Sequence, residues 1–248
     1  MSRYLASFYP ESRFGGFTGI DGTIAFYSRV NALLTPSSVV LDFGCGRGSY
    51  QHDAVPFRLQ LRVIKGKVAR VIGLDVDPAA QENQFVDDFR LLRAGQAWPI
   101  EGGSVDLVLC DHVLEHLADP EQVFAESRRV LRQGGNLCIR TPNVLSYFGV
   151  ISWLVPTRYR HSLLRVAQSE RKEEAFPTLY RCNTIWPLRR MMVKYGFEHV
   201  VYGYESEPAY LNFSKFFYGL GVLHQRLAPE VFRLGIFAFG RRNSGGRT

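Results

Sequence analysis

The stretch VVLDFGCGRG, from Val39 to Gly48, decides the fold, because an apolar run there leads directly into closely spaced glycines. A strand followed at once by Gly44, Gly46 and Gly48 is typical of a tight turn that passes under a bound nucleotide. Glycine suits such a turn because it tolerates positive φ angles and lets the backbone approach a ligand closely. The stretch therefore predicts the first strand and the ligand-binding turn of a doubly wound α/β fold.

The chemistry around these glycines favours a cationic ligand without phosphate over a dinucleotide. The spacing is GxGxG, whereas dinucleotide-binding turns read GxGxxG and aim a helix N-terminus at a pyrophosphate. Asp42 would repel a pyrophosphate and attract a cation. S-adenosylmethionine (SAM) has no phosphate and carries an ammonium and a sulfonium group. The turn therefore suits SAM better than NAD, and an NAD-dependent oxidoreductase is the weaker alternative.

A second apolar run, VIGLDVDP, ends in Asp75 one strand after the glycine turn. A doubly wound fold places an acid there that accepts hydrogen bonds from the ribose hydroxyls. We expect Asp75 and the adjacent Val76 to belong to the cofactor site. Gly48 and Asp75 lie 27 positions apart, where about 20 from motif to acid is usual. The extra residues, around 58–67, are basic, and we expect them to form a surface excursion.

The rest of the chain alternates short apolar runs with helical ones, which is the pattern of parallel strands joined by helical crossovers. Strands are expected at 38–43, 70–74, 105–110, 136–140, 198–204 and 234–239. Helices are expected at 20–34, at 210–227, and after Asp119, which is an N-cap candidate before Pro120, until Gly134 and Gly135 stop the helix. The expected fold is a Rossmann-like, mostly parallel sheet with helices on both faces, an antiparallel last strand and a late insertion.

One domain is expected for the 248 residues, since no linker or repeat divides them. Its expected parts are an N-terminal helical segment (1–36), a SAM-binding core (37–143), an acceptor-side segment (144–195) and the last strands with a helical insertion (196–248).

Four blocks of sequence resemble the class I SAM-dependent methyltransferases, and most closely the type-11 branch that includes the quinone-biosynthesis methyltransferases. The blocks are VVLDFGCGRG, VIGLDVDP, WPIEGGSVDLVLCDHVLEHLADP and RRVLRQGGNLCIRTPN, which together span residues 39–143. The resemblance implies that the glycine turn holds the methionine end of SAM, that Asp75 holds the ribose, and that Asp111 and His112 line the methyl-transfer site. It also implies an acid near the adenine, for which Asp88 is our candidate. The residues expected at the cofactor site are thus Asp42, Gly44, Cys45, Gly46, Gly48, Asp75, Val76, Asp88 and Asp111.

Methyl transfer is an in-line displacement, so the protein must hold the acceptor atom about 3 Å from the methyl carbon, opposite the sulfur. A hydroxyl acceptor must also lose a proton. His112 is the best-placed base, because it follows the strand expected at 105–110, at the carboxyl edge of the sheet, where ligands bind. His161 is a second catalytic candidate. A histidine at such a position lines a site and forms hydrogen bonds there as often as it acts as a base.

The segment HVLEH, residues 112–116, also matches the HxxEH pattern of zinc peptidases. That pattern needs continuous helical turns, whereas His112 is expected at a bend between a strand and a helix. We therefore expect no metal, while a methyltransferase that binds a metal through Glu115 and His116 stays an open alternative.

The walls of the acceptor pocket are expected after Asn143. The candidates are Trp153, Tyr159, Arg160, His161, Phe176, Tyr180, Arg181, Asn183, Tyr210, Phe213, Phe216, Phe217 and Tyr218. Aromatic residues beside arginines suit a small ring, a sugar or a lipid-linked molecule that bears an anionic group, although core packing explains the same aromatics. An RNA methyltransferase and a non-catalytic SAM-binding module are the remaining alternatives.

The net charge of +7 arises in the C-terminal part of the chain. Residues 1–140 hold 15 Lys and Arg against 16 Asp and Glu, and residues 141–248 hold 15 against 7. This excess fits an anionic acceptor, a membrane surface or a merely solvated arginine-rich surface.

The four cysteines lie too far apart for a metal or redox motif, so a reducing, cytoplasmic compartment is expected. Peripheral contact with the inner face of a membrane, through 141–157 or 210–223, stays open.

Overall fold

The computed structural model of the protein describes residues 3–93, 95–147, 149 and 177–243. Its strands form one sheet in the order β3-β2-β1-β4-β5-β7-β6. They are β1 (Val39–Phe43), β2 (Arg70–Asp75), β3 (Asp88–Leu91), β4 (Val105–Asp111), β5 (Leu131–Pro142), β6 (Phe197–Tyr204) and β7 (Gly235–Arg242). Neighbouring strands are parallel except at β7, which is antiparallel to both β5 and β6.

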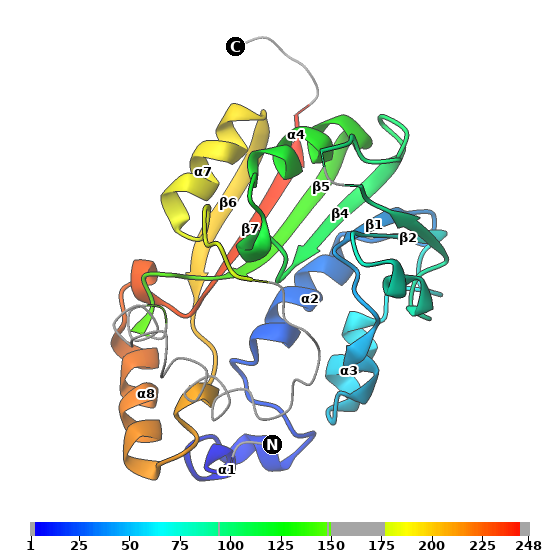
Figure 1. The fold of residues 1–248 in the computed structure, drawn as a ribbon. Coiled ribbons are helices and arrows are strands. Elements are labelled where there is room, and N and C mark those ends of the chain that lie inside the picture. The colour runs from blue at the N-terminus through cyan, green and yellow to red at the C-terminus, as the bar shows by residue number, and fades with distance from the viewer. Residues whose placement is uncertain (1–2, 94, 148, 150–176, 244–248) are drawn as a thin grey trace.

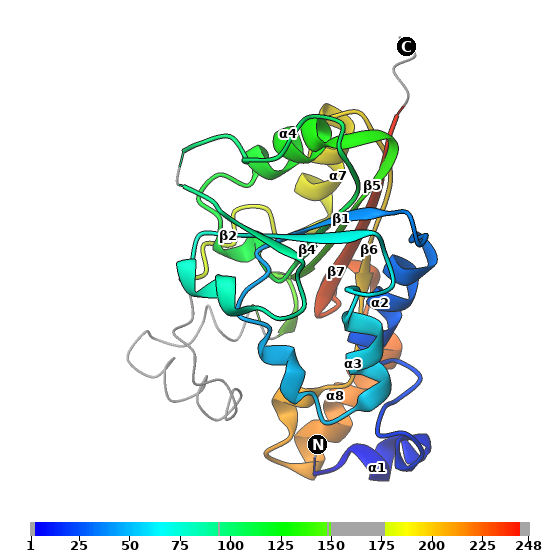
Figure 2. The ribbon, with the colours of Figure 1, turned by 90° about the vertical axis from the view of Figure 1, so that its right-hand side faces the viewer.

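Helices cover both faces of the sheet, as Figures 1 and 2 show. The α-helices are α1 (Leu5–Phe8), α2 (Gly22–Ala32), α3 (Pro56–Arg62), α4 (Glu121–Val130), α7 (Ile185–Lys194) and α8 (Lys215–Leu227). Short 3-10 helices are η1 (Pro10–Arg13), η2 (Ser49–His52), η3 (Pro78–Glu82), η4 (Leu114–His116), η5 (Ala209–Leu211) and η6 (Glu230–Phe232). Helices α4 and α7 pack on one face of the sheet, and α2 packs on the other.

The core explains why the central strands read as continuous apolar runs. Val40 and Leu41 are adjacent in β1, point to opposite faces, and are both fully buried because each face is covered by helices. On the α2 side, the ring of Phe26 lies 5.2 Å from that of Phe237. On the other side, Phe43 stacks on Trp98 at 4.7 Å.

The topology brings the ends of several strands to one place. Strand β1 lies between β2 and β4, so the chain reverses its direction of winding there. Ligands of doubly wound folds bind outside the carboxyl ends of the strands at this switch point. Helices α1 and α8 lie beyond this edge, where Figure 1 shows them side by side, and they share a small core of their own, formed by Leu5, Tyr9, Tyr218 and Val222.

The predicted doubly wound fold with an antiparallel last strand is confirmed. The sequence missed strand β3, because DFRL is short and only half-buried. The helix after Asp119 begins at Glu121 with Pro120 as its N-cap, and the Asp119 carboxylate accepts a hydrogen bond from the Glu121 N–H at 3.1 Å. It ends at Val130 rather than at the glycines, since β5 begins at the next residue.

The basic segment 58–67 is not only a surface excursion. It contains most of α3, which lies beside α2 (Figure 2). Arg58 donates hydrogen bonds to Asp21 at 2.9 Å and to Asp53 at 2.6 Å, and Lys67 donates to Asn31 at 3.0 Å. These contacts fix α3 against α2, so the extra residues become part of the wall next to the glycine turn.

The described part of the chain contains no helix of the length and apolarity that a membrane span requires. The four cysteines are free thiols and are all buried.

Candidate functional site

The turn after β1 has the backbone that its glycines predict. Gly44, Gly46 and Gly48 have φ angles of 71°, 54° and 72°, which side chains other than glycine rarely adopt. A Cβ at Gly44 would lie 2.2 Å from the Val113 side chain. A Cβ at Gly46 would meet nothing within 4 Å. The turn is therefore tight at its start and opens onto free space at Gly46, where a ligand can approach the backbone.

Asp75 anchors this turn from the end of β2. Its Oδ2 accepts a hydrogen bond from the Gly46 N–H at 2.9 Å, and its Oδ1 accepts one from the Asp77 N–H at 2.9 Å. A carboxylate has about four acceptor sites, so two remain for the hydroxyls of a ribose. Asn83, which the sequence did not single out, fixes the turn from below by donating to the carbonyl of Cys45 at 2.9 Å.

The other residues expected near the turn have different surroundings. Cys45 is 6% exposed, and its sulfur faces Gly73 on β2, so only its backbone faces the open side. Burial raises the pKa of this thiol well above its ordinary value. Val76 is 49% exposed next to Asp75 and offers an apolar surface at the cofactor edge.

The side chain of Asp42 lies in half-buried surroundings. This residue precedes Phe43 at the end of β1, and in the described part of the chain no group donates a hydrogen bond to its carboxylate. Burial raises its pKa to about 7, and the negative charge of Asp111 adds to the rise, which Arg62 offsets in part. A carboxylate in such a place gains most from a bound cation. This observation fits the expectation that Asp42 attracts a positively charged ligand.

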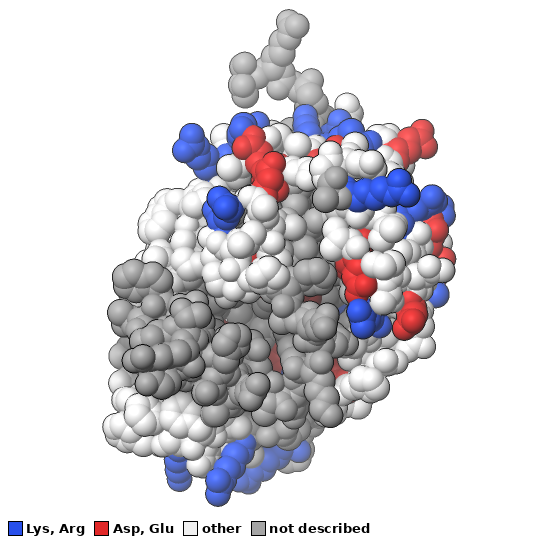
Figure 3. Space-filling view, viewed as in Figure 1, with Lys and Arg blue, Asp and Glu red and all other residues white. Residues whose placement is uncertain are grey.

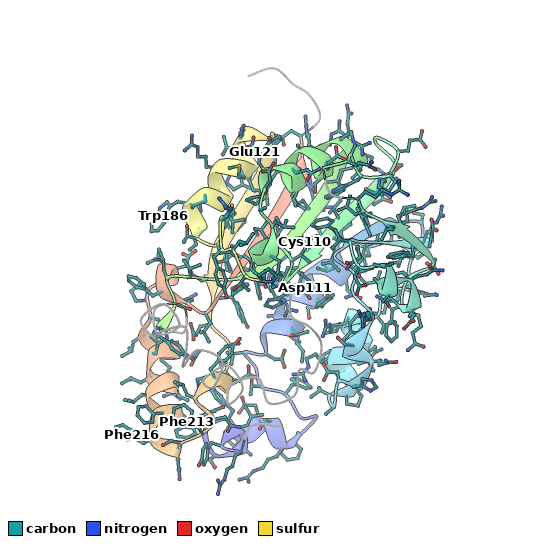
Figure 4. The ribbon with its side chains drawn as sticks, in the orientation of Figure 1. Cys110, Asp111, Glu121, Trp186, Phe213 and Phe216 are labelled. Carbon is teal, nitrogen blue, oxygen red and sulfur yellow. The ribbon has the colours of Figure 1, made fainter. Side chains whose placement is uncertain are left out.

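Asp111, which Figure 4 labels, lies at the end of β4. It is held by a buried ion pair that the sequence did not predict. Arg140 on β5 donates to both of its oxygens, at 2.6 Å and 2.7 Å, and Tyr27 on α2 donates at 2.8 Å. Burial alone would raise the pKa of Asp111, but the charge and hydrogen bonds of Arg140 hold it below its usual range. Asp111 therefore stays ionised and ties α2 to the site.

Arg62, the last residue of α3, is a second cation beside the site. Its guanidinium lies 4.3 Å from the ring centroid of Tyr50 and 5.7 Å from that of Tyr27. Tyr50 in turn stacks on Phe85 at 4.8 Å. The Nε of Arg62 is buried and has no hydrogen-bond partner in the described part of the chain. The aromatic rings thus hold a guanidinium whose hydrogen-bonding capacity is not used up.

His112 is strained and accessible. Its φ angle is 58°, a left-handed conformation that is uncommon outside glycine, and its side chain is 47% exposed. Its N–H donates to the Arg140 carbonyl at 2.9 Å, which holds the backbone in place. Strain of this kind persists where the surroundings enforce it, and it is found preferentially at functional sites.

A buried chain of hydrogen bonds orients the His112 ring. The Nδ1 of His112 lies 3.3 Å from Oε1 of Glu115, and Oε2 of Glu115 accepts from Thr141 at 3.0 Å. Asn183 donates to the Thr141 hydroxyl at 2.6 Å. Burial alone would raise the pKa of Glu115, but its hydrogen bond with His112 lowers it. The arrangement resembles a histidine and acid pair in which Glu115 contacts Nδ1, while Nε2 lies 4.0 Å from Oδ1 of Asp111.

Asp88 is not brought to the site. It begins β3 opposite Ile72, whereas Leu91 is the residue of β3 opposite Asp75. Its carboxylate is bonded to Arg70 at 2.7 Å and to Arg90 at 2.8 Å. The expected adenine acid is therefore corrected: Asp88 lies at the start of β3 rather than after it, and no acid occurs in the sequence from 89 to 100.

The segment HVLEH does not form the helical turns that a zinc-peptidase site needs. His112 precedes the three-residue η4, and Nδ1 of His116 lies 3.2 Å from the carbonyl of Pro177. In the part of the chain that the structure describes, no group of His, Cys, Asp or Glu side chains is arranged to hold a metal ion.

The expected acceptor residues divide into three groups. Trp153, Tyr159, Arg160, His161 and Phe176 lie outside the described residues. Tyr180, Arg181, Tyr210, Phe213, Phe216 and Phe217 are exposed, and Asn183 is buried below Thr141. Tyr218 is fully buried against Leu5 and Tyr9, so it is a core residue and the expectation that it lines the pocket is wrong.

Comparison with known proteins finds methyltransferases that are similar to this part of the chain. Residues 41–139 match a family model of type 11 described as a methyltransferase domain. A protein of Mycolicibacterium smegmatis named a probable S-adenosylmethionine-dependent methyltransferase is 37% identical over 111 residues, which are 44% of this chain and 39% of that protein. A ubiquinone biosynthesis O-methyltransferase of Xanthomonas oryzae is 32% identical over 109 residues, or 42% and 43% of the two chains.

The solved structures agree in fold. A SAM-dependent methyltransferase from Archaeoglobus fulgidus superimposes with a TM-score of 0.54 at 18% identity, covering 94% of this chain and 97% of that one. The chain spans less than half the length of the curated relatives named above. The residues that the family model matches, 41–139, include the glycine turn, Asp75 and Asp111. Residues 41–139 are therefore similar to methyltransferase domains of type 11, as the four sequence blocks predicted.

Proposed function

We propose that this protein transfers a methyl group from SAM to a hydroxyl group of a small molecule. The observation that carries the proposal is the glycine turn, which opens onto free space at Gly46, where the Gly46 N–H donates to the carboxylate of Asp75. When bound there, SAM supplies a methyl carbon that is open to in-line attack. The chain has to hold this cofactor, orient the acceptor and remove a proton.

We assign each end of the cofactor to a residue whose charge or hydrogen-bonding groups complement it. The ribose hydroxyls fit the free acceptor positions of Asp75, and the positively charged groups fit Asp42. The methionine end of SAM also bears a carboxylate, which needs a cation. Arg140 is already committed to Asp111, whereas the Nε of Arg62 has no partner in the described part of the chain. Arg62 is therefore the residue that we assign to the carboxylate of SAM.

His112 is the base in this proposal. Glu115 holds Nδ1, which leaves Nε2 to accept the proton of an acceptor hydroxyl. Asp111 Oδ1 lies 4.0 Å from Nε2, so a carboxylate is close enough to stabilise the imidazolium that forms. Glu115 and Asp111 thus act as positioning and stabilising residues around one imidazole.

The choice of oxygen as the acceptor atom rests mainly on this histidine, since a base is of most use where a hydroxyl proton must leave. The Xanthomonas relative is named as an O-methyltransferase, which supports the same choice. That alignment covers 42% of this chain.

The glycine turn gives a matched pair of variants. Gly44→Ala places a Cβ against Val113 and should cost about 2–3 kcal/mol of stability, which thermal melting would show. Gly46→Ala meets no protein atom, so it should cost only about 1 kcal/mol through its backbone strain, yet bind S-adenosylhomocysteine at least tenfold more weakly. Unchanged binding by Gly46→Ala would mean that the cofactor does not lie against this turn.

Arg62→Gln should weaken binding of S-adenosylhomocysteine about tenfold or more in calorimetry, since hydrogen bonds to charged groups contribute about 1.5–3 kcal/mol. Methylthioadenosine has the same nucleoside without the amino acid, and its affinity should stay the same. Arg70→Gln, on β2 but paired with Asp88, is the control and should change neither affinity. Parallel loss of both ligands in Arg62→Gln would show that Arg62 supports the fold and not the carboxylate.

His112→Ala should lower methyl transfer at least a hundredfold, as expected for loss of a general base, and leave affinity for S-adenosylhomocysteine within twofold. Glu115→Gln should lower transfer less, and His199→Ala, a histidine on β6, should have no effect. The assay follows labelled methyl from SAM into the small-molecule fraction of a deproteinised cell extract. Label in the RNA fraction, or binding of SAM without any transfer, would contradict the proposed function.

A further inference from the structure

Helix α8 is apolar on two opposite sides. Its inner side packs on the N-terminal segment, where Tyr218 and Val222 are buried with Leu5 and Tyr9. Its outer face carries Phe213, just before the helix, and Phe216, Phe217, Leu220, Leu223 and Leu227, which are 46–71% exposed. Their spacing of three or four residues aligns them along one side of the helix. An amphipathic helix with a packed inner side would normally carry polar residues there.

The outer face belongs to a firmly held helix. A Cβ at Gly221 would lie 2.4 Å from the Cβ of Pro208, so α8 approaches the segment before η5 closely. The ring of Tyr218 lies 5.2 Å from that of Phe8 and 6.0 Å from that of Tyr4. The exposed rings are therefore presented at a fixed position. Figure 4 shows Phe213 and Phe216 at the opposite end of the molecule from Glu121.

The charge around this face is positive. The sequence from Pro208 to Pro229 contains no Asp or Glu, and both Lys215 and Arg226 are exposed. In Figure 3, the charged side chains visible at the end of the molecule that holds α1 and α8 are basic. The neighbouring segment 3–20 adds the exposed Arg3 and Arg13 against the single acid Glu11. The result is an apolar strip with a cationic border.

We propose that the outer face of α8 docks the protein on a membrane surface that contains anionic lipid. Phenylalanine and leucine side chains enter the boundary between head groups and acyl chains, while lysine and arginine stay at the phosphates. At 13 residues and 1.5 Å per residue, α8 is about 20 Å long, which suits a helix lying in the plane of the membrane. A second copy of the chain fits less well, because it would bring Lys215 and Arg226 against their own copies.

The docking surface lies on the acceptor side of the molecule. Helices α1 and α8 sit beyond the carboxyl edge of the sheet, where Asp111 ends β4 (Figures 1 and 4). A protein docked in this way would face a lipid-embedded or lipid-linked acceptor. The docking itself does not rest on the proposed methyl transfer, since the outer face shares no residue with the cofactor site. The other stretch expected at a membrane, 141–157, lies mostly outside the described residues.

Sedimentation with vesicles tests the proposal on the full chain. Wild type should sediment with vesicles of phosphatidylcholine and phosphatidylglycerol, and at least tenfold less with phosphatidylcholine alone. The double variant Phe216→Ala, Phe217→Ala and the double variant Lys215→Glu, Arg226→Glu should each lose at least tenfold of this binding. Trp186→Ala is the matched control, because Trp186 is 57% exposed on α7, away from α8, and it should bind as wild type does.

Thermal melting checks that the variants are folded. Because they alter exposed positions, they should melt within a few degrees of wild type. The proposal is overturned if wild type stays in the supernatant with both kinds of vesicle, if anionic lipid makes no difference, or if Trp186→Ala loses as much binding as the phenylalanine variant. It is also overturned if light scattering shows a wild-type dimer that the phenylalanine variant dissociates, because the outer face would then be an interface between two copies. Retained methyl transfer with lost vesicle binding would leave the proposed function intact.

Discussion

Three carboxylates meet at the carboxyl edge of the sheet, and in the described part of the chain only Asp111 forms an ion pair at hydrogen-bond distance. Asp111 has a forked ion pair with Arg140, and Asp75 is satisfied in part by backbone N–H groups. Asp42 has neither, and burial beside Asp111 raises its pKa to about 7. Unpaired negative charge in a partly buried place costs free energy that a bound cation recovers. In the proposed function, this imbalance favours a nucleoside that carries positive charge over one that carries a pyrophosphate.

Distant parts of the chain build the surroundings of these carboxylates. Helix α2 supplies Tyr27 to Asp111 and Thr23 to Arg140. Helix α3 lies between Gly48 and Asp75, where the chain is longer than is usual between the glycine motif and the acid. It supplies Arg62, which lies over the ring of Tyr50. On the acceptor side, Thr141 and Asn183 hold Glu115, which in turn orients His112. The surroundings of the carboxylates and those of His112 therefore depend on different elements, so the cofactor end and the acceptor end that we propose can be altered separately.

Features with a local cause were predictable from the sequence. The glycine turn, Asp75 and the central strands follow from glycine conformation and from apolar runs buried on both faces. Arg140 and Tyr27 could not be found in this way, because the partners of Asp111 lie 29 and 84 residues away and only the sheet order brings them together. Asp88 was misplaced because strand β3 was not recognised, so its register against β2 was unknown. The strain at His112 has no signature in the sequence.

The most direct measurement is calorimetric titration of the unmodified protein with SAM, with S-adenosylhomocysteine and with NAD under one set of conditions. An acidic turn that opens at Gly46 should bind SAM and its demethylated product and bind NAD at least a hundredfold more weakly, because the pyrophosphate would face Asp42 and Asp75. Binding of NAD as tight as that of SAM would contradict the assignment of the site.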